Sequence, residues 1–203
     1  MFKKVAADVL GIGDVGTVIK PEDYDKVDAD DYILHEDDEK IYFLIKSKSD
    51  EYCFTNLAFV HVDGLSAASK KRTLRRYNYA NNKIKNVLLE TAGTVDLDVE
   101  IKFSIGQNSY SIDVHKKHLD EVKDLYKALI KIAETNHDND ALFGYAKQSL
   151  DLASNTLNRI GSENNLVDQF KDLNQFAFNW LVAARKKYVP KDLGHIFEKY
   201  INN

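Results

Sequence analysis

The sequence predicts an α+β protein in which about seven antiparallel strands form a partly open barrel, one helix caps the barrel, and an all-α helical hairpin follows. Two patterns carry this prediction. Between residues 95 and 105 apolar and polar residues alternate strictly, as in a strand with one buried and one solvent-exposed face, which antiparallel sheets allow. After residue 115 the apolar period lengthens from two residues to about 3.6, the period of an amphipathic helix.

The composition is that of an ordinary globular protein in a reducing compartment. The chain has 203 residues and a net charge of −4, and this acidic balance argues against a dedicated nucleic-acid binder. Its one cysteine, Cys53, cannot form an internal disulfide, and its strand-like surroundings favour a small buried side chain over a reactive thiol. No apolar run approaches the roughly 18 residues that cross a bilayer. We therefore expect a cytoplasmic location.

Residues 1–30 are expected to hold a short N-terminal helix and a linker. Phe2, Val5 and Val9 share one side of that helix, which we expect to dock on the protein itself or on a second copy, with membrane contact as the lesser alternative. Residues 11–30 are rich in glycine and aspartate, as linkers are.

Residues 31–137 are predicted to form the barrel and its capping helix. Apolar alternation between turn residues indicates strands, which we place at residues 41–45, 52–55, 58–62, 72–79, 84–90, 95–105 and 110–114. One apolar stripe from residue 115 to residue 136 indicates the capping helix, with Asp113 as its N-cap. The polar run at residues 136–140 is expected to end this helix.

Residues 138–203 are predicted to form a helical hairpin that serves as an oligomerisation region. Its second helix, residues 163–188, carries apolar side chains around more than half of its circumference at 100° per residue. One partner helix does not cover so wide a face. The surplus packs on the barrel, on the last helix or on another copy of the chain, and we expect another copy. The predicted interface residues are Phe170, Phe176, Phe178, Trp180 and Val182.

No catalytic, cofactor or metal site is predicted. Residues 11–16 match the glycine fingerprint of dinucleotide-binding loops, but no buried strand precedes them and Pro21 shortens any helix that follows. His115 and His118 are about one helical turn apart, yet no cysteine or carboxylate grouping indicates further metal ligands. The other histidines, His61 among them, are scattered and are expected at the surface.

A basic cluster lies at residues 70–76. Its Arg72, Arg75 and Arg76 could bind phosphate groups of a lipid, a nucleic acid or a phosphorylated partner. The alternative is a solvated strand whose charges prevent pairing at the sheet edge.

Residues 88–100, with the sequence Leu-Leu-Glu-Thr-Ala-Gly-Thr-Val-Asp-Leu-Asp-Val-Glu, resemble the signature of the bacterial pleckstrin-homology (PH) family, and residues 54–56, Phe-Thr-Asn, also fit the family pattern. Residues 40–56 and the helical tail look like those of its YvbH-like subgroup, in which a C-terminal helical hairpin is an oligomerisation region. The resemblance implies a PH-like, partly open barrel of about seven strands with a C-terminal capping helix, assembled into a cyclic ring without established enzymatic activity.

The resemblance also implies a polar protein-binding surface near the junction of adjacent protomers. Four residues fall on the signature and join the arginines as candidates for this surface: Glu90, Thr91, Asp96 and Asp98. In lipid-binding PH domains the loop between the first two strands is basic, whereas we assign that loop here to residues 36–39, which are four acids in a row. Such a loop repels an anionic head group.

The sequence therefore predicts a non-catalytic module that self-assembles and binds a protein partner of unknown identity, without nucleic acid and without a cofactor. The alternative is a peripheral module that binds anionic lipids through the basic residues 70–76.

Overall fold

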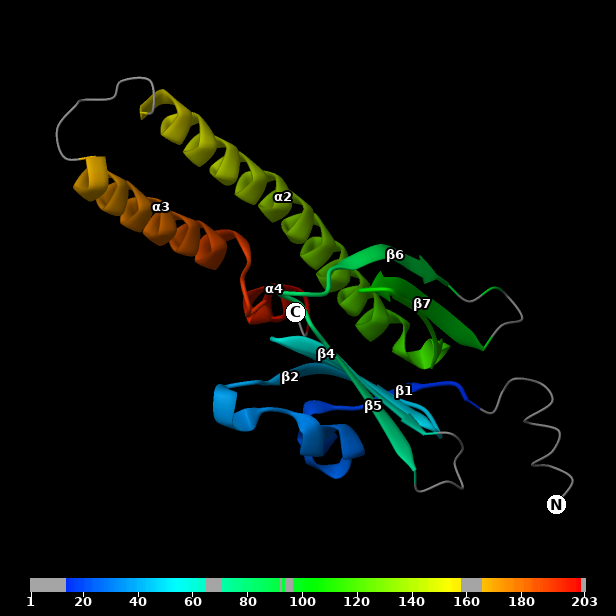
Figure 1. Ribbon diagram of the computed structural model, residues 1–203. Helices are drawn as coiled ribbons and strands as arrows, with labels where there is room; N and C mark the ends of the chain where they lie inside the picture. Colours follow the sequence, from blue (N-terminus) through cyan, green and yellow to red (C-terminus); the bar gives the residue numbers. More distant parts are fainter. Residues whose placement is uncertain (1–13, 65–70, 92, 94–96, 158–165, 202–203) are drawn as a thin grey trace, which may run out of the picture. The chain divides into compact units, whose positions relative to one another are not determined.

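The computed structural model describes residues 14–64, 71–91, 93, 97–157 and 166–201 (Figure 1). Two compact units are present: one comprises residues 1–133 and 191–203, and the other comprises residues 134–190. The elements are β1 (Thr17–Val18), η1 (Pro21–Lys26), η2 (Asp28–Tyr32), η3 (His35–Asp37), β2 (Ile41–Lys46), β3 (Asp50–Thr55), β4 (Ala58–Gly64), β5 (Arg72–Asn78), β6 (Ile84–Glu90), β7 (Asp98–Ile105), β8 (Asn108–His115), η4 (Lys116–His118), α2 (Leu119–Leu157), α3 (Leu166–Tyr188) and α4 (Gly194–Tyr200).

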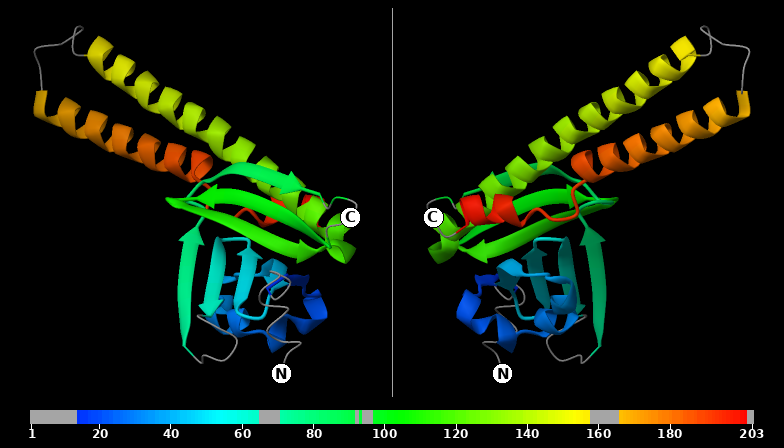
Figure 2. Two further views of the ribbon diagram at one scale, coloured as in Figure 1. Left: turned by 90° about the vertical axis from the view of Figure 1, so that its right-hand side faces the viewer. Right: turned by 90° about the vertical axis from the view of Figure 1, so that its left-hand side faces the viewer.

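The first unit contains two antiparallel sheets, which confirms the predicted fold class. One sheet has the order β1-β2-β3-β4-β5 and the other has the order β6-β7-β8. The strands expected from the sequence correspond to β2 through β8, and β1 adds two residues at the edge of β2. Figure 2 shows the two sheets as separate layers. Among the described strands β5 pairs only with β4, and β6 pairs only with β7, so the barrel is open between them.

A close backbone approach joins the two sheets on the other side of the barrel. Gly16 forms a bridge with Val114, in which the Gly16 N–H donates to the Asp113 carbonyl at 2.7 Å and the His115 N–H donates to the Gly16 carbonyl at 3.0 Å. A Cβ at Gly16 would lie 2.5 Å from the Cγ2 of Ile45, so only glycine fits here. Gly16 thus serves strand packing; residues 11–13 of the predicted linker motif lie outside the described residues.

The long alternating strand is confirmed as β7. Val99, Ile101, Phe103 and Ile105 are buried, and the residues between them are half-buried. The strand begins at Asp98, and Leu97, which the alternation places on the buried face, is 54% exposed. Val95 lies outside the described residues.

One apolar core lies between the two sheets and includes side chains from the first half of α2 and from α4. Val122, Leu125, Leu129 and Ile132 of α2 are buried in this core. The C-terminal segment, which the sequence analysis groups with the hairpin, contributes to the same core through its own buried side chains: Leu193, Ile196, Phe197 and Ile201. The Leu193 N–H donates to the carbonyl of Asn56 at 2.8 Å and fixes the start of this segment to the turn between β3 and β4.

A second apolar cluster lies on the other face of the five-stranded sheet, where η1 and η2 cover it (Figure 2). This is the segment expected to be a linker. Val27, Ala29 and Ile33 are buried against the sheet, where Leu44, Cys53 and Val60 are also buried. Cys53 is therefore a buried side chain, as predicted, and burial raises its pKa.

The buried carboxylate of Glu51 anchors η2 to the sheet. Glu51 accepts the N–H of Asp28 at 3.3 Å and that of Ala29 at 2.6 Å, and it also pairs with Lys46. These N–H groups are the unpaired donors at the start of η2. Because such anchoring depends on single residues rather than on apolar periodicity, the sequence pattern did not indicate these helices.

The acidic residues 36–39 are not the loop between the first two predicted strands. The turn between β2 and β3 consists of residues 47–49, whereas residues 36–38 lie before β2 at η3. Glu39 is 1% exposed and accepts hydrogen bonds from the Leu34 N–H at 2.8 Å and the Thr55 hydroxyl at 2.5 Å. The expected repulsion of an anionic head group by this loop therefore does not apply at the β2–β3 turn.

The capping helix does not end at the polar run of residues 136–140. Helix α2 continues from Leu119 to Leu157 without interruption. The run contains neither glycine nor proline, and most of its side chains are at least partly exposed, so polarity alone does not break the helix. Asp113 is not the N-cap, because it belongs to β8; the His115 ring accepts from the Lys117 N–H at the start of η4 instead.

The second unit consists of the rest of α2 and α3, which run antiparallel as the predicted hairpin (Figure 1). One side of α3 is sheltered: Leu173, Ala177, Trp180 and Leu181 are half-buried, and Ala184 is buried. The predicted N-terminal helix of residues 1–10 lies outside the described residues, and the predicted domain boundaries at residues 30 and 137 stay predictions.

Candidate functional site

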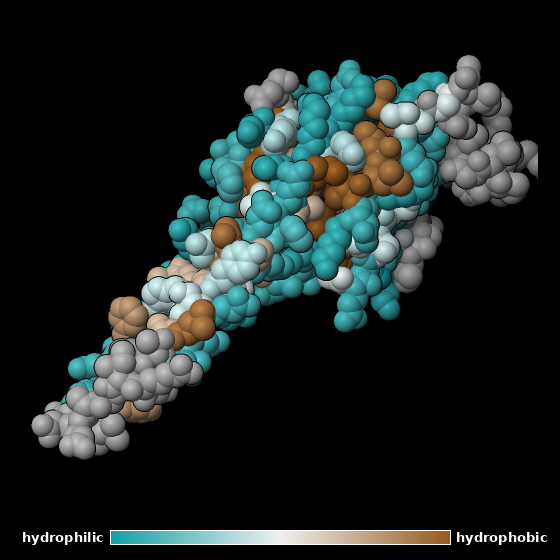
Figure 3. Space-filling model, turned by 90° about the horizontal axis from the view of Figure 1, so that it is seen from above, coloured by the Kyte–Doolittle hydropathy of each residue, from teal (hydrophilic) through white to brown (hydrophobic). Residues whose placement is uncertain are grey.

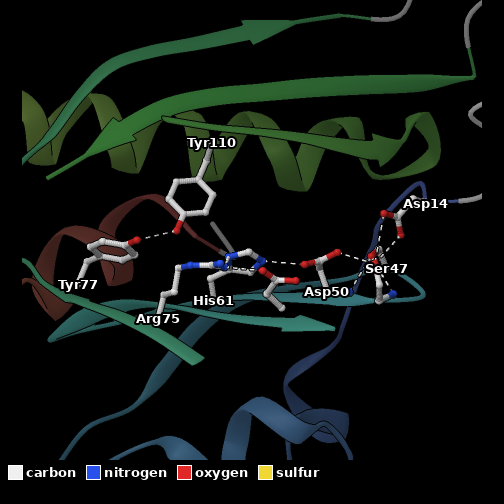
Figure 4. Close-up of polar contacts among 9 residues, drawn as sticks. Asp14, Ser47, Asp50, His61, Arg75, Tyr77 and Tyr110 are labelled. Carbon is white, nitrogen blue, oxygen red and sulfur yellow. Dashed lines mark hydrogen bonds and ion pairs between the residues drawn. The ribbon is translucent and has the colours of Figure 1, made fainter. Parts of the chain in front are cut away.

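A buried histidine network lies on the inner face of the five-stranded sheet (Figure 4). His61 of β4 is 7% exposed, and its Nε2 lies 2.8 Å from the Oδ1 of Asp50 of β3. Its Nδ1 lies 3.4 Å from a guanidinium nitrogen of Arg75 of β5, and the same nitrogen donates to Asp63 at 2.6 Å. Figure 4 shows Asp50 and Arg75 on opposite sides of the His61 ring.

The partners of His61 define the form of its ring that fits this geometry. A guanidinium group only donates hydrogen bonds, so the Nδ1 that faces Arg75 acts as an acceptor. The proton of the neutral ring then lies on Nε2 and is donated to Asp50. The hydrogen bond to Asp63 raises the pKa of Arg75, so the guanidinium stays charged.

Aromatic rings surround the imidazole. Tyr52 stacks on it with ring centroids 4.6 Å apart, and Tyr110 meets it edge-on at 5.4 Å. The Tyr110 hydroxyl donates to the Tyr77 hydroxyl at 3.1 Å, which joins β8 of one sheet to β5 of the other. Burial raises the pKa of both Tyr52 and Tyr110, so both phenols are neutral.

Serine, histidine and aspartate meet in this network, but not as a nucleophilic triad. Ser49 Oγ donates to Asp50 at 2.5 Å and lies 3.3 Å from Asp14, whereas the imidazole contacts Asp50 from the other side. A nucleophilic hydroxyl must contact the imidazole directly to lose its proton to it. Within the described residues, no group of three or more metal-ligating side chains is placed to hold a metal ion.

The burial of His61 differs from the expectation based on the sequence, which placed this residue at the surface. The signal that could have located it is its spacing from Phe59. Residues two apart in a strand point to the same face, and Phe59 is an obvious core residue. His61 is therefore buried beside the core, where it has specific polar partners.

The three arginines of the basic cluster do not form one surface, because alternate residues of β5 point to opposite faces. Arg72 and Arg76 face the layer of short helices, where Arg72 lies 3.3 Å from Asp28 and Arg76 lies 3.0 Å from Glu39. Arg75 points into the barrel toward His61 and Asp63. Lys70 lies outside the described residues.

The acidic candidates lie on the outer face of the other sheet. Glu90 pairs with Lys102 at 3.0 Å, and Lys102 also pairs with Glu100 at 2.9 Å. Asp98 is half-buried at the start of β7, Thr91 is exposed, and Asp96 lies outside the described residues. The arginine and carboxylate candidates therefore do not come together as a single site.

The predicted interface residues of the hairpin are mostly exposed within a single chain. Phe170 is 68% exposed, Phe176 and Phe178 are each 62% exposed, and Val182 is 37% exposed, whereas Trp180 is half-buried. Apolar side chains interrupt the polar surface of the hairpin in Figure 3. Helix α2 adds exposed apolar residues that the sequence analysis did not assign to the interface: Leu142, Tyr145 and Leu152.

None of the described helices combines the length and the apolar character that crossing a membrane requires.

Comparison with known proteins identifies two regions of the chain. Residues 9–133 match the family model described as "Bacterial PH domain", and residues 144–203 match the one described as "YvbH-like oligomerisation region". The chain is 59% identical over 204 residues to "Uncharacterized protein YvbH" of Bacillus subtilis (strain 168), with 100% of both chains covered.

A solved structure is also similar. The crystal structure of a PH domain containing bacterial protein from Exiguobacterium sibiricum 255-15 shares 56% identity and a TM-score of 0.87, covering 93% of this chain and 100% of that one. The two-sheet barrel, the match over residues 9–133 and these relatives agree with one another. The chain belongs to the bacterial PH domain family and carries a YvbH-like oligomerisation region.

Proposed function

We propose that this protein is a non-catalytic module that self-assembles through the hairpin of α2 and α3 into a cyclic homo-oligomer and presents polar barrel surfaces to a protein partner. The observation that carries the proposal is the exposure of large apolar side chains on both helices of the hairpin. Among the described residues, seven such side chains lie on these two helices, and a concentration of exposed apolar surface marks an interaction site.

The distribution of these side chains supports a cyclic assembly rather than a two-fold dimer. At 100° per residue, Phe176 lies on one flank of the sheltered side of α3, Phe178 lies on the other flank, and Val182 lies almost opposite the sheltered side. A hairpin with apolar residues on two flanks is suited to different neighbours on each side. Such head-to-tail contacts generate a ring when the rotation between neighbours closes.

The outer face of the three-stranded sheet is the surface that we propose for a protein partner. Glu90, Asp98 and Asp113 lie on this face, where Lys102 pairs with Glu90 and Glu100. The arginines of β5 are less suited to a partner, because Arg72 and Arg76 already pair with Asp28 and Glu39. The same pairs argue against anionic-lipid binding through this cluster.

Light scattering on full-length variants tests the assembly. Phe176→Glu and Phe178→Glu each place a charge on one flank, and we expect each to reduce the mass of the assembly because a buried, unpaired charge is costly. His195→Glu is the control, since His195 is exposed on α4, outside the hairpin. An unchanged mass in both phenylalanine variants, with the control also unchanged, would contradict an α3 interface.

A further inference from the structure

In the buried network around His61, a second proton on the imidazole is incompatible with the contact that the ring makes with Arg75. The neutral imidazole donates from Nε2 to Asp50 and accepts at Nδ1 from Arg75. A second proton on the ring must attach to Nδ1. That position would then present an N–H to a guanidinium group that itself has only N–H donors.

We propose that His61 and Arg75 form a proton-operated latch, in which the neutral ring holds Arg75 at the barrel interior and a protonated ring releases it. Imidazole is the side chain whose charge ordinarily changes between pH 5 and pH 8. A neutral ring therefore keeps the contact at the upper end of this range, and protonation replaces an attractive contact by a repulsion between like charges.

Arg75 has a second partner and access to solvent, which make its release feasible. Its guanidinium is bound to Asp63 at 2.6 Å, and its side chain is 40% exposed. The loss of the imidazole contact therefore leaves Arg75 with one carboxylate partner and with water, rather than with a buried unpaired charge.

The other groups that face the ring come from three strands. From β3, Asp50 attracts a proton on the ring and Tyr52 stacks on its face; from β4, Asp63 neutralises Arg75; from β8, Tyr110 meets the ring edge-on. Burial keeps both phenols neutral, so Asp50 and Arg75 are the charged groups in direct contact with the imidazole. Their effects on protonation are opposite in sign.

The polar contacts of the latch extend to the turn between β2 and β3. Asp50 accepts a hydrogen bond from Ser49 of that turn, and Ser49 lies 3.3 Å from the carboxylate of Asp14. A chain of polar contacts thus connects His61 to β5 on one side and to the segment before β1 on the other (Figure 4). This gives the barrel a site at which pH changes the position of a charged side chain.

Exchange of the imidazole C2 hydrogen with deuterium, followed by mass spectrometry, tests the latch in the assembled full-length protein. The method gives a titration midpoint for each histidine regardless of the size of the assembly. In Arg75→Gln the competing charge is gone, and we expect the midpoint of His61 to move upward by about one pH unit. In Asp50→Asn we expect it to move downward.

His35 serves as an internal control in the same digest. It pairs with Asp30 at 3.0 Å but is well exposed and remote in sequence from β5, so Arg75→Gln should leave its midpoint unchanged. A His61 midpoint that stays the same or falls in Arg75→Gln overturns the proposal. Crystal structures of the unmodified protein at pH 5 and pH 8 are a second test: the contact between Arg75 and His61 must be present at the higher pH and absent at the lower.

Discussion

The carboxylates of the barrel differ in how their charge is compensated. Glu51 is 4% exposed but accepts two backbone N–H groups and pairs with Lys46, which is the arrangement that a buried charge requires. Asp113 is in a different situation. Its side chain is exposed, but partial desolvation, followed by the nearby charges of Glu100 and Asp98, raises its pKa above the ordinary value.

The raised pKa of Asp113 predicts a stabilising substitution. A group whose pKa is higher in the folded state binds its proton more tightly there, so its contribution to stability is full at low pH and is lost as the pH rises through the folded-state pKa. Asp113→Asn cannot lose a proton. We expect this variant to match the unmodified protein near pH 3 and to be more stable at pH 7 in urea unfolding.

The pKa of Glu100, in the same sheet, is shifted in the opposite direction. The Ser111 hydroxyl, and next Lys102, lower its pKa. Its contribution to stability is therefore present above the ordinary pKa of glutamate and is lost as the pH falls through the lowered value. Glu100→Gln should be less stable than the unmodified protein at pH 7 and similar to it near pH 2. Equal pH profiles for Asp113→Asn and Glu100→Gln would contradict this account.

At the scale of elements, regular periodicity was sufficient to predict the strands and helices. Strand β7 and the helices α2 and α3 follow from periods of two and about 3.6 residues. Periodicity does not locate the ends of elements, because exposed polar residues are compatible with a helix; the run at residues 136–140 therefore lies inside α2. It also does not reveal 3-10 helices anchored by single carboxylates such as Glu51.

The candidate site was less predictable than the fold because it depends on the partners that folding brings together. A cluster in sequence, Arg72 to Arg76, is divided between two faces by the alternation of β5. The partners of His61, on the other hand, come from β3 and β5, and no local pattern joins them. The hairpin interface was predictable in part, since an excess of apolar residues on α3 is a property of one helix.

The apolar alternation provides a matched pair of substitutions, Ile101 within β7 and Leu97 just before its start. Ile101 is fully buried, and Ile101→Asp should destabilise the barrel by several kcal/mol because the new carboxylate has no partner in the core. Leu97 is 54% exposed, and Leu97→Asp should change the free energy of unfolding by less than about 0.5 kcal/mol. Circular dichroism during urea unfolding measures both, and comparable losses in the two variants would contradict the assigned start of β7.

Helix α4 is predicted to be required for the stability of the barrel. Phe197 is fully buried among side chains of both sheets and α2, so Phe197→Ala should cost about 3–5 kcal/mol. His195→Ala on the same helix is the control, since His195 is exposed. The measurement is urea unfolding at one fixed protein concentration. A loss below about 1 kcal/mol for Phe197→Ala would show that α4 does not belong to the barrel core.

At the scale of the whole molecule, the hairpin is an insertion between two parts of the barrel core. The chain leaves the core within α2, passes through residues 134–190, and returns to the core with α4. Truncation after residue 137 would therefore remove Phe197 and its neighbours along with the hairpin. Point substitutions in α3 separate assembly from barrel stability, because the exposed phenylalanines are not part of the core.

Sedimentation velocity of the unmodified full-length protein at micromolar concentration tests the central claim, self-assembly through the hairpin, most directly. The account predicts one species whose mass is more than twice the 23.2 kDa of a single chain, with no monomer boundary as the protein is diluted through this range. A single species of 23.2 kDa at every concentration would contradict it.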